Sequence, residues 1–157
     1  MTTTDNPFWQ YAIELYRQPG VESACLQFQN TCGGNVNLLL FCCWLTSQHH
    51  GLTDDQLTEL EKLVKYWDDL VLRELRQLRE QCRVGENASD LQQTVYQHLK
   101  ALELKLEQQV CVQLWEWQQH SYQPIRQNDK AVCLYASQHC DFPVQITEIL
   151  KAAGINF

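Results

Sequence analysis

The sequence lacks the features that membrane and secreted proteins carry. Its longest apolar run, Leu38 to Leu45, is well short of the roughly 20 residues that a membrane-spanning helix needs. The start of the chain, Met1 to Asp5, holds no basic cluster followed by an apolar stretch, so no secretory signal is visible. We therefore expect no membrane association and a cytoplasmic location.

The spacings of known catalytic and metal sites are missing as well. The sequence contains no His-Glu-x-x-His, no Cys-x-x-Cys pair, no Cys/His zinc spacing, no glycine-rich phosphate loop and no serine hydrolase signature. Di-metal carboxylate bundles use a Glu-x-x-His spacing, but neither Glu103 nor Glu107 is followed by a histidine three residues on. We predict no catalytic residue, no cofactor and no metal ligand. A metalloprotein built from distant residues is the least favoured alternative.

An excess of positive charge is also absent, since the net charge at pH 7 is −7. Nucleic-acid-binding proteins draw much of their affinity from a basic surface, and anionic lipid likewise attracts basic segments. The charge balance therefore argues against nucleic acid and membrane surfaces as partners.

Cysteine, by contrast, is plentiful, with eight residues. Without an export signal we expect a reducing compartment, in which disulfides are disfavoured. Most of the cysteines fall on apolar helix faces, where a free thiol behaves as a small hydrophobic side chain. We interpret most of them as inert core residues.

Helical patterns cover most of the chain, and no segment predicts a strand. The segment Val36–Thr46 is apolar on nearly every side, which is typical of a helix in the centre of a bundle. Thr53 and Ser89 each precede a long amphipathic segment, and each is followed three residues later by glutamine, the spacing of a capping box. Two long helices are therefore predicted, the first of them about 30 residues long.

Each long helix carries one apolar stripe at steps of three and four residues. The predicted buried residues of the first are Leu57, Leu60, Val64, Trp67, Val71, Leu75, Leu78 and Cys82. Those of the second are Leu91, Val95, Leu99, Leu102, Leu106, Val110, Leu114 and Trp117. A tight turn at Val84–Asn87, with Gly85 as the stop, packs the two helices antiparallel.

These patterns predict an all-α fold, a single-domain bundle of about six or seven helices around a long antiparallel helical hairpin. The domain spans residues 1–157, the hairpin about 53–118, and short C-terminal helices about 129–153. A helical bundle of this length buries a sizeable core without disulfides.

Polar residues on and beside the hairpin form the candidate binding site. Arginine offers a planar fork of donors to phosphate or carboxylate, and a buried amide such as that of Asn37 must find partners. The candidate binding residues are Asn37, Trp67, Arg73, Arg76, Glu103 and Glu107. The alternative is structural: the charges pair with one another, and Asn37 ties down a neighbouring helix end.

Several segments also carry a family resemblance. They are Phe8-Trp9, Leu15-Tyr16, Pro19-Gly20-Val21, Ala24-Cys25-Leu26, Gly34, Val36–Phe41, Trp44-Leu45, Trp67, Leu70–Arg79 and the glutamates Glu103 and Glu107. With them, residues from about 7 to 115 resemble the bacterial domain-of-unknown-function 2390 family. The resemblance implies a small cytosolic protein without an assigned activity, so it transfers no function. The sequence departs from the family at Asn35, where aspartate is usual, and the resemblance does not extend beyond Pro124.

Two classes of function fit these observations. The missing catalytic spacings, the helical build and the acidic surface favour a non-catalytic interaction or regulatory module that binds another protein or itself. The alternative is a small-molecule binding protein or enzyme, with an anionic ligand held between helices by Arg73 and Arg76. The first predicts an exposed apolar patch, and the second a closed pocket lined by the candidate residues.

Overall fold

The computed structural model describes residues 6–83, 85, 88–122, 125, 131–139 and 144–155. Every regular element in this part of the chain is helical, which confirms the predicted all-α fold. The elements are α1 (Pro7–Tyr16), α2 (Val21–Cys32), α3 (Val36–Ser47), α4 (Asp54–Trp67), the π-helical turn η2 (Asp68–Leu72), α5 (Arg73–Gln81), α6 (Asp90–His120), α7 (Ala131–His139) and α8 (Val144–Ala152). Because α4, η2 and α5 follow one another without a break, the described residues form seven helical rods.

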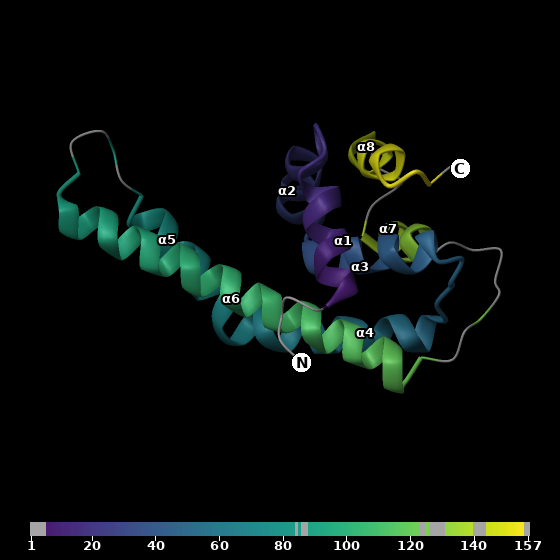
Figure 1. The fold of residues 1–157 in the computed structure, drawn as a ribbon. Coiled ribbons are helices and arrows are strands. Elements are labelled where there is room, and N and C mark those ends of the chain that lie inside the picture. The colour runs from purple at the N-terminus through teal and green to yellow at the C-terminus, as the bar shows by residue number, and fades with distance from the viewer. Residues whose placement is uncertain are drawn as a thin grey trace.

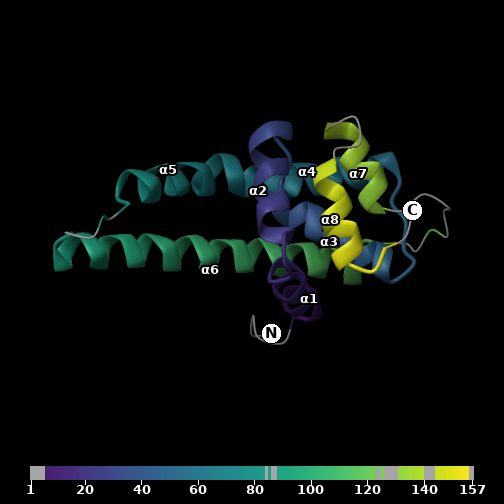
Figure 2. The same ribbon diagram turned by 90° about the horizontal axis from the view of Figure 1, so that it is seen from above.

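A globular head and a two-helix arm make up the molecule. The head contains α1, α2, α3, α7 and α8, with α4 and the C-terminal half of α6 beneath them (Figure 1). The arm consists of α5 and the N-terminal half of α6, which run side by side away from the head in both views (Figures 1 and 2). Most of the predicted turn at its tip, Val84, Glu86 and Asn87, lies outside the described residues.

Side-chain hydrogen bonds cap the starts of several helices. Asn6 caps α1, because its side-chain oxygen accepts from the N–H groups of Phe8 and Trp9. Thr53 and Ser89 each accept from the backbone of the glutamine three residues on, and that glutamine side chain accepts from the backbone N–H of the cap. Both predicted capping boxes are therefore confirmed.

The third helix lies at the centre of the head. Every side chain from Leu38 to Cys43 is buried, as its apolar sequence predicts. Helices α1, α2, α6 and α7 pack around α3, and α8 packs against α2. Under the α2–α3 loop, the rings of Phe28 and Tyr135 meet edge to face with their centroids 5.8 Å apart. The hydroxyl of Tyr135 also accepts the backbone N–H of Asn35 at 2.8 Å, so α7 fixes the start of α3.

The arm, in contrast, has almost no buried side chain. No residue in the range 90–109 of α6 is buried, and α5 buries Leu75 alone among its described residues. The prediction of burial is therefore wrong for Leu78, Leu91, Val95 and Leu102. Periodicity identifies the apolar side of a helix. It does not show how far the helices of the head extend, and they do not reach these four residues.

The sequence pattern of the first long helix implies one continuous α-helix, but the structure interrupts it. At Asp68–Leu72 it widens into one π-helical turn, in which the N–H of Arg73 donates to the carbonyl of Asp68. A π turn takes up one more residue than an α turn and so shifts the phase of the helix beyond it. The turn therefore sets the orientation of α5 relative to α4.

Of the seven cysteines in the described part of the chain, four are core residues, as predicted for most of the cysteines. Cys25, Cys42, Cys43 and Cys111 are buried free thiols. Burial raises the pKa of all four thiols, that of Cys25 to about 12, and a protonated thiol is a poor nucleophile. Cys32 corrects the expectation that disulfides are disfavoured, because it is disulfide-bonded.

Candidate functional site

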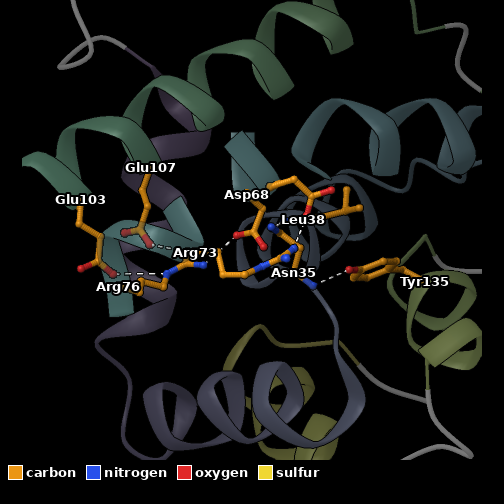
Figure 3. A network of polar contacts seen from close by, with 9 residues as sticks. Asn35, Leu38, Asp68, Arg73, Arg76, Glu103, Glu107 and Tyr135 are labelled. Atoms are coloured by element: carbon orange, nitrogen blue, oxygen red, sulfur yellow. Dashed lines mark hydrogen bonds and ion pairs between the residues drawn. The ribbon is translucent and has the colours of Figure 1, made fainter. Parts of the chain in front are cut away.

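Five charged side chains of the hairpin, those of Asp68, Arg76, Arg79, Glu103 and Glu107, meet in one ion network, most of which is drawn in Figure 3. Arg76 lies at its centre. Its Nη1 donates to Asp68 at 2.8 Å and its Nη2 donates to Glu107 at 3.1 Å, while its Nε lies 3.4 Å from Oε1 of Glu103. Arg76 thus faces three carboxylates from two different helical rods.

Arg79 extends this network one turn toward the tip of the arm. Its Nε donates to Oε2 of Glu103, so that glutamate bridges two arginines. Burial alone lowers the pKa of the Arg76 guanidinium, but Glu107 and Asp68 outweigh it and raise that pKa. Burial raises the pKa of the Glu107 carboxyl against the opposing effect of Arg76. The network is shielded from water, since the side chains of Glu103 and Arg76 are 12% and 20% exposed.

The π-helical turn brings Asp68 to Arg76. In a regular α-helix, two residues eight positions apart point about 80° away from each other. The wider turn takes up an additional residue, which rotates Asp68 toward the face of Arg76. Asp68 is absent from the predicted set because a regular helix signals a pair at four residues, the spacing of Asp69 to Arg73.

A cavity of about 460 Å³ lies beside the network, between the end of α2, the α2–α3 loop and the start of α5. Its lining residues are Gln29, Asn30, Gly33, Gly34, Asn35, Asp68, Arg73, Arg76 and Gln77. Two guanidinium groups and several side-chain amides make this lining rich in hydrogen-bond donors. Small-molecule sites commonly have volumes of about 300–1,000 Å³, so the cavity is large enough for one.

The two arginines of the cavity differ in accessibility. Arg76 is held by the three carboxylates of the network, whereas the side chain of Arg73 is 56% exposed and pairs with Asp69. Asp69 also pairs with Lys65 at 2.9 Å. A hydrogen bond from Lys65, together with the charges of Lys65 and Arg73, lowers the pKa of the Asp69 carboxyl. Arg73 is therefore the more accessible cation at the cavity.

The other predicted site residues do not line this cavity. Trp67 donates from its indole Nε1 to Oε1 of Gln113 at 2.7 Å, which joins α4 to α6. The thiol of Cys111 donates to Oδ1 of Asn37 at 3.8 Å, which joins α3 to α6. The two predicted glutamates point into the ion network (Figure 3). Of the six predicted residues, the structure brings the two arginines to the cavity and places the others in contacts between helices.

A second candidate surface lies on one side of the arm, away from the ion network. Leu78 and Leu102 each come immediately before a network residue, Arg79 or Glu103, which is a rotation of about 100° on each helix. Because α5 and α6 are antiparallel, both rotations lead to the same side of the arm. Leu78 and Leu102 are each 47% exposed on that side.

Two further residues of α6 continue this row toward the tip of the arm. Val95 is 40% exposed and Leu91 is 72% exposed, and they precede Leu102 by seven and eleven residues, on the same side of the helix. We define the apolar face of the arm as Leu78, Leu91, Val95 and Leu102. All four belong to the stripes predicted as buried. The sequence therefore identifies the residues of this face, but it does not show that they are exposed.

Neither a metal site nor a membrane span is found in the described part of the chain. Within it, no group of three or more His, Cys, Asp or Glu side chains is placed to hold a metal ion. None of its helices combines the length and the apolar character that crossing a bilayer requires.

Comparison with known protein families gives a match. A family model described as a protein of unknown function, DUF2390, matches residues 7–114. This range contains α1 to α5 and most of α6, and therefore the ion network, the cavity and the apolar face. No curated protein and no solved structure matches.

Proposed function

The chain belongs to the DUF2390 family of proteins of unknown function, and from that premise we propose that it is a non-catalytic interaction module that binds through the apolar face of its arm. The resemblance to bacterial cytosolic proteins supports placing this interaction in the bacterial cytoplasm. The buried thiols, the absence of catalytic spacings in the sequence and the self-paired charges of the hairpin support a role without chemistry.

The strongest support is the lack of buried side chains over residues 90–109 of α6. Ordering the backbone of one residue costs about 1–2 kcal/mol, and helices in proteins gain most of their stability by packing an amphipathic face. The ion network stabilises the base of the arm, whereas Leu91 and Val95 face water near its tip. A helical partner on the apolar face would supply the missing burial.

The gain from covering this face is substantial. Full burial of a valine or leucine side chain contributes about 1.5–3 kcal/mol, so covering the exposed half contributes about 1 kcal/mol for each. The four residues of the apolar face together therefore supply about 4 kcal/mol, which is a large fraction of the roughly 5–15 kcal/mol by which native proteins are stable.

Site-specific photo-crosslinking tests this proposal in cells. A photoreactive amino acid replaces Leu102, on the apolar face, or Leu104, which is 49% exposed on the same helix but about 200° away around it. We expect a discrete crosslinked product from position 102 and none from position 104. The same labelling from both positions, or no product from either, would contradict an interaction through this face.

The second candidate function is binding of a small anionic ligand in the cavity. The observation that favours it is the convergence of Arg73 and Arg76 with several side-chain amides on one cavity. Within the part of the chain that the structure describes, Arg73 pairs with the exposed Asp69, which leaves donors of its guanidinium for a phosphate or carboxylate. No catalytic group is assigned to this cavity.

Titration with phosphate and with citrate, followed by the NMR shifts of the amides of Gly33 and Asn35, tests this second function. We expect saturable shifts in the wild type that are lost in Arg73→Ala. The matched control is Arg83→Ala, which removes an arginine that is 77% exposed near the tip of the arm and should keep the response. Identical titrations of all three proteins would rule out an anion site at Arg73.

A further inference from the structure

We propose that the occupant of the apolar face is the apolar face of a second copy of this chain, so that two arms form a four-helix bundle. The inference rests on the proposed function, because it names the partner of the same face. A projecting two-helix arm is half of a four-helix bundle, and helix bundles bury their apolar stripes toward a shared centre.

The apolar face has the pattern of a bundle seam. Leu78 on α5 and Leu102 on α6 lie at the same level of the arm, and Val95 and Leu91 extend the row along α6. Leucine and valine repeated at steps of four and seven residues are typical of helices that pack against other helices. Two-fold symmetry supplies a partner with the same row.

The size of the face is close to what a dimer needs. Residues 90–109 of α6 extend over about 30 Å at 1.5 Å per residue, and α5 (Arg73–Gln81) lies beside about 14 Å of this length. With helices about 10 Å wide, the face covers about 440 Å² per copy, or about 900 Å² in the two copies. This area approaches the ~1,000 Å² in total that a specific interface buries.

Complementary charges flank the face. Glu74 lies on the outer edge of α5 beyond Leu78, and Lys105 lies on the outer edge of α6 beyond Leu102. Both side chains are exposed, and neither forms an ion pair within the part of the chain that the structure describes. Since Arg76 pairs with glutamates on either side of Lys105, Glu74 and Lys105 lie at about the same level of the arm.

This charge pattern selects one arrangement of the two arms. A two-fold axis along the arm places α5 of one copy over α6 of the other at the same level. Glu74 of each copy then faces Lys105 of the other, twice in the dimer. An axis across the arm instead places α5 over α5 and α6 over α6, so that edges of the same charge meet. Charge complementarity therefore favours the axis along the arm.

The heads do not obstruct this contact. Arg73 and Arg76 line the cavity against the α2–α3 loop, so the side of α5 that carries them faces the head. Leu78 lies about 140° from Arg73 and about 160° from Arg76 around the helix, and so points away from the head. Two copies joined through their apolar faces therefore keep their heads on the outside.

Sedimentation analysis of the full chain over a range of concentrations tests the inference. We expect the mass of two chains at high concentration, and we expect Leu102→Glu to raise the dimer Kd by about tenfold or more, since it places a carboxylate in the seam. Leu104→Glu, with nearly the same exposure on the same helix, should leave the Kd unchanged.

Charge reversal tests the arrangement. We expect Glu74→Lys and Lys105→Glu each to weaken the dimer, because two like-charge contacts replace two ion pairs. The double variant Glu74→Lys/Lys105→Glu should restore the Kd of the wild type, because each pair is then reversed. A double variant weaker than either single variant would overturn the arrangement with the axis along the arm.

The outcomes separate this inference from the proposed function. A single-chain mass at every concentration, together with a crosslink from position 102 to a different protein, would overturn the second copy and leave the interaction through the face intact. A single-chain mass without any crosslink would overturn both. A crosslinked product with the mass of two chains supports both.

Discussion

Gly34 lies so close to the ring of Phe28 that no side chain fits between them. A Cβ on Gly34 would overlap Cε1 and Cζ of that ring. Phe28 has no room to move, because it is fully buried and packs edge to face against Tyr135. Gly34→Ala is therefore expected to lower the free energy of unfolding by about 1–3 kcal/mol, the usual cost of overpacking, as measured by urea denaturation.

The matched control for this substitution is Gly85→Ala. A Cβ at Gly85 meets nothing within 4 Å, so the free energy of unfolding should change by less than about 0.5 kcal/mol. If Gly34→Ala proved as stable as Gly85→Ala, the close packing of the α2–α3 loop on Phe28 would be incorrect.

Arg76→Ala should destabilise the protein far more than Arg73→Ala. Removing Arg76 leaves the shielded carboxylates of Asp68, Glu103 and Glu107 without their shared cation. We expect a loss of about 2–3 kcal/mol, less than for a fully buried pair because the network is partly exposed. Thermal and urea denaturation of the two variants provide the measurement.

Arg76→Lys refines this prediction. An ammonium group is a point charge without a planar fork, so lysine should recover only part of the stability that alanine loses. Complete recovery would show that charge alone matters at this position. Equal losses in Arg76→Ala and Arg73→Ala would contradict a network centred on Arg76.

Asn6 is expected to stabilise the protein through both ends of its amide. Its oxygen caps α1, and its Nδ2 donates to the backbone carbonyl of Cys111 at 3.2 Å, which ties α1 to α6. Asn6→Ala removes both bonds and should cost about 1–3 kcal/mol. Asn6→Ser keeps a capping oxygen, but the shorter side chain does not reach α6. The unfolding free energy of this variant should therefore lie between those of Asn6→Ala and the wild type. If Asn6→Ser were as stable as the wild type, the hydrogen bond to α6 would contribute nothing to stability.

Glu107 is expected to make the protein less stable as the pH rises. Burial raises the pKa of Glu107 above 4.5 in the folded protein, so the folded state binds this proton more tightly than the unfolded chain does. The contribution of the group to the free energy of unfolding is therefore largest below pH 4.5, and it falls as the pH rises through the folded pKa.

Glu107→Gln removes this dependence, so the unfolding free energy of the variant minus that of wild type should increase from pH 4.5 toward neutrality. Urea denaturation over a pH series measures this difference, and a constant value would contradict the raised pKa.

Features with a local cause were predictable from the sequence. Thr53 and Ser89 carry their capping partners three residues on, and both caps form as predicted. The central position of Val36–Thr46 also follows from its composition, because a helix without a polar side must be surrounded by others.

Features that depend on distant parts of the chain were not predictable in this way. Val110 and Leu102 belong to the same stripe of α6, yet Val110 is 1% exposed and Leu102 is 47% exposed. The period of the stripe is the same at both positions, and what differs is whether the head reaches them. The contact of Asp68 with Arg76 likewise depends on a π turn, which the sequence of the segment does not predict.

The π-helical turn at Asp68–Leu72 also has an evolutionary consequence. A residue inserted into a regular helix rotates everything beyond it by about 100°, unless a π turn takes up the additional residue. Deleting one residue here would restore a regular helix with Asp68 and Arg76 seven positions apart and on the same face, so Arg76 and Leu78 would keep their orientation. A lineage can therefore gain or lose one codon in this segment while the ion network and the surface that the arm displays are preserved.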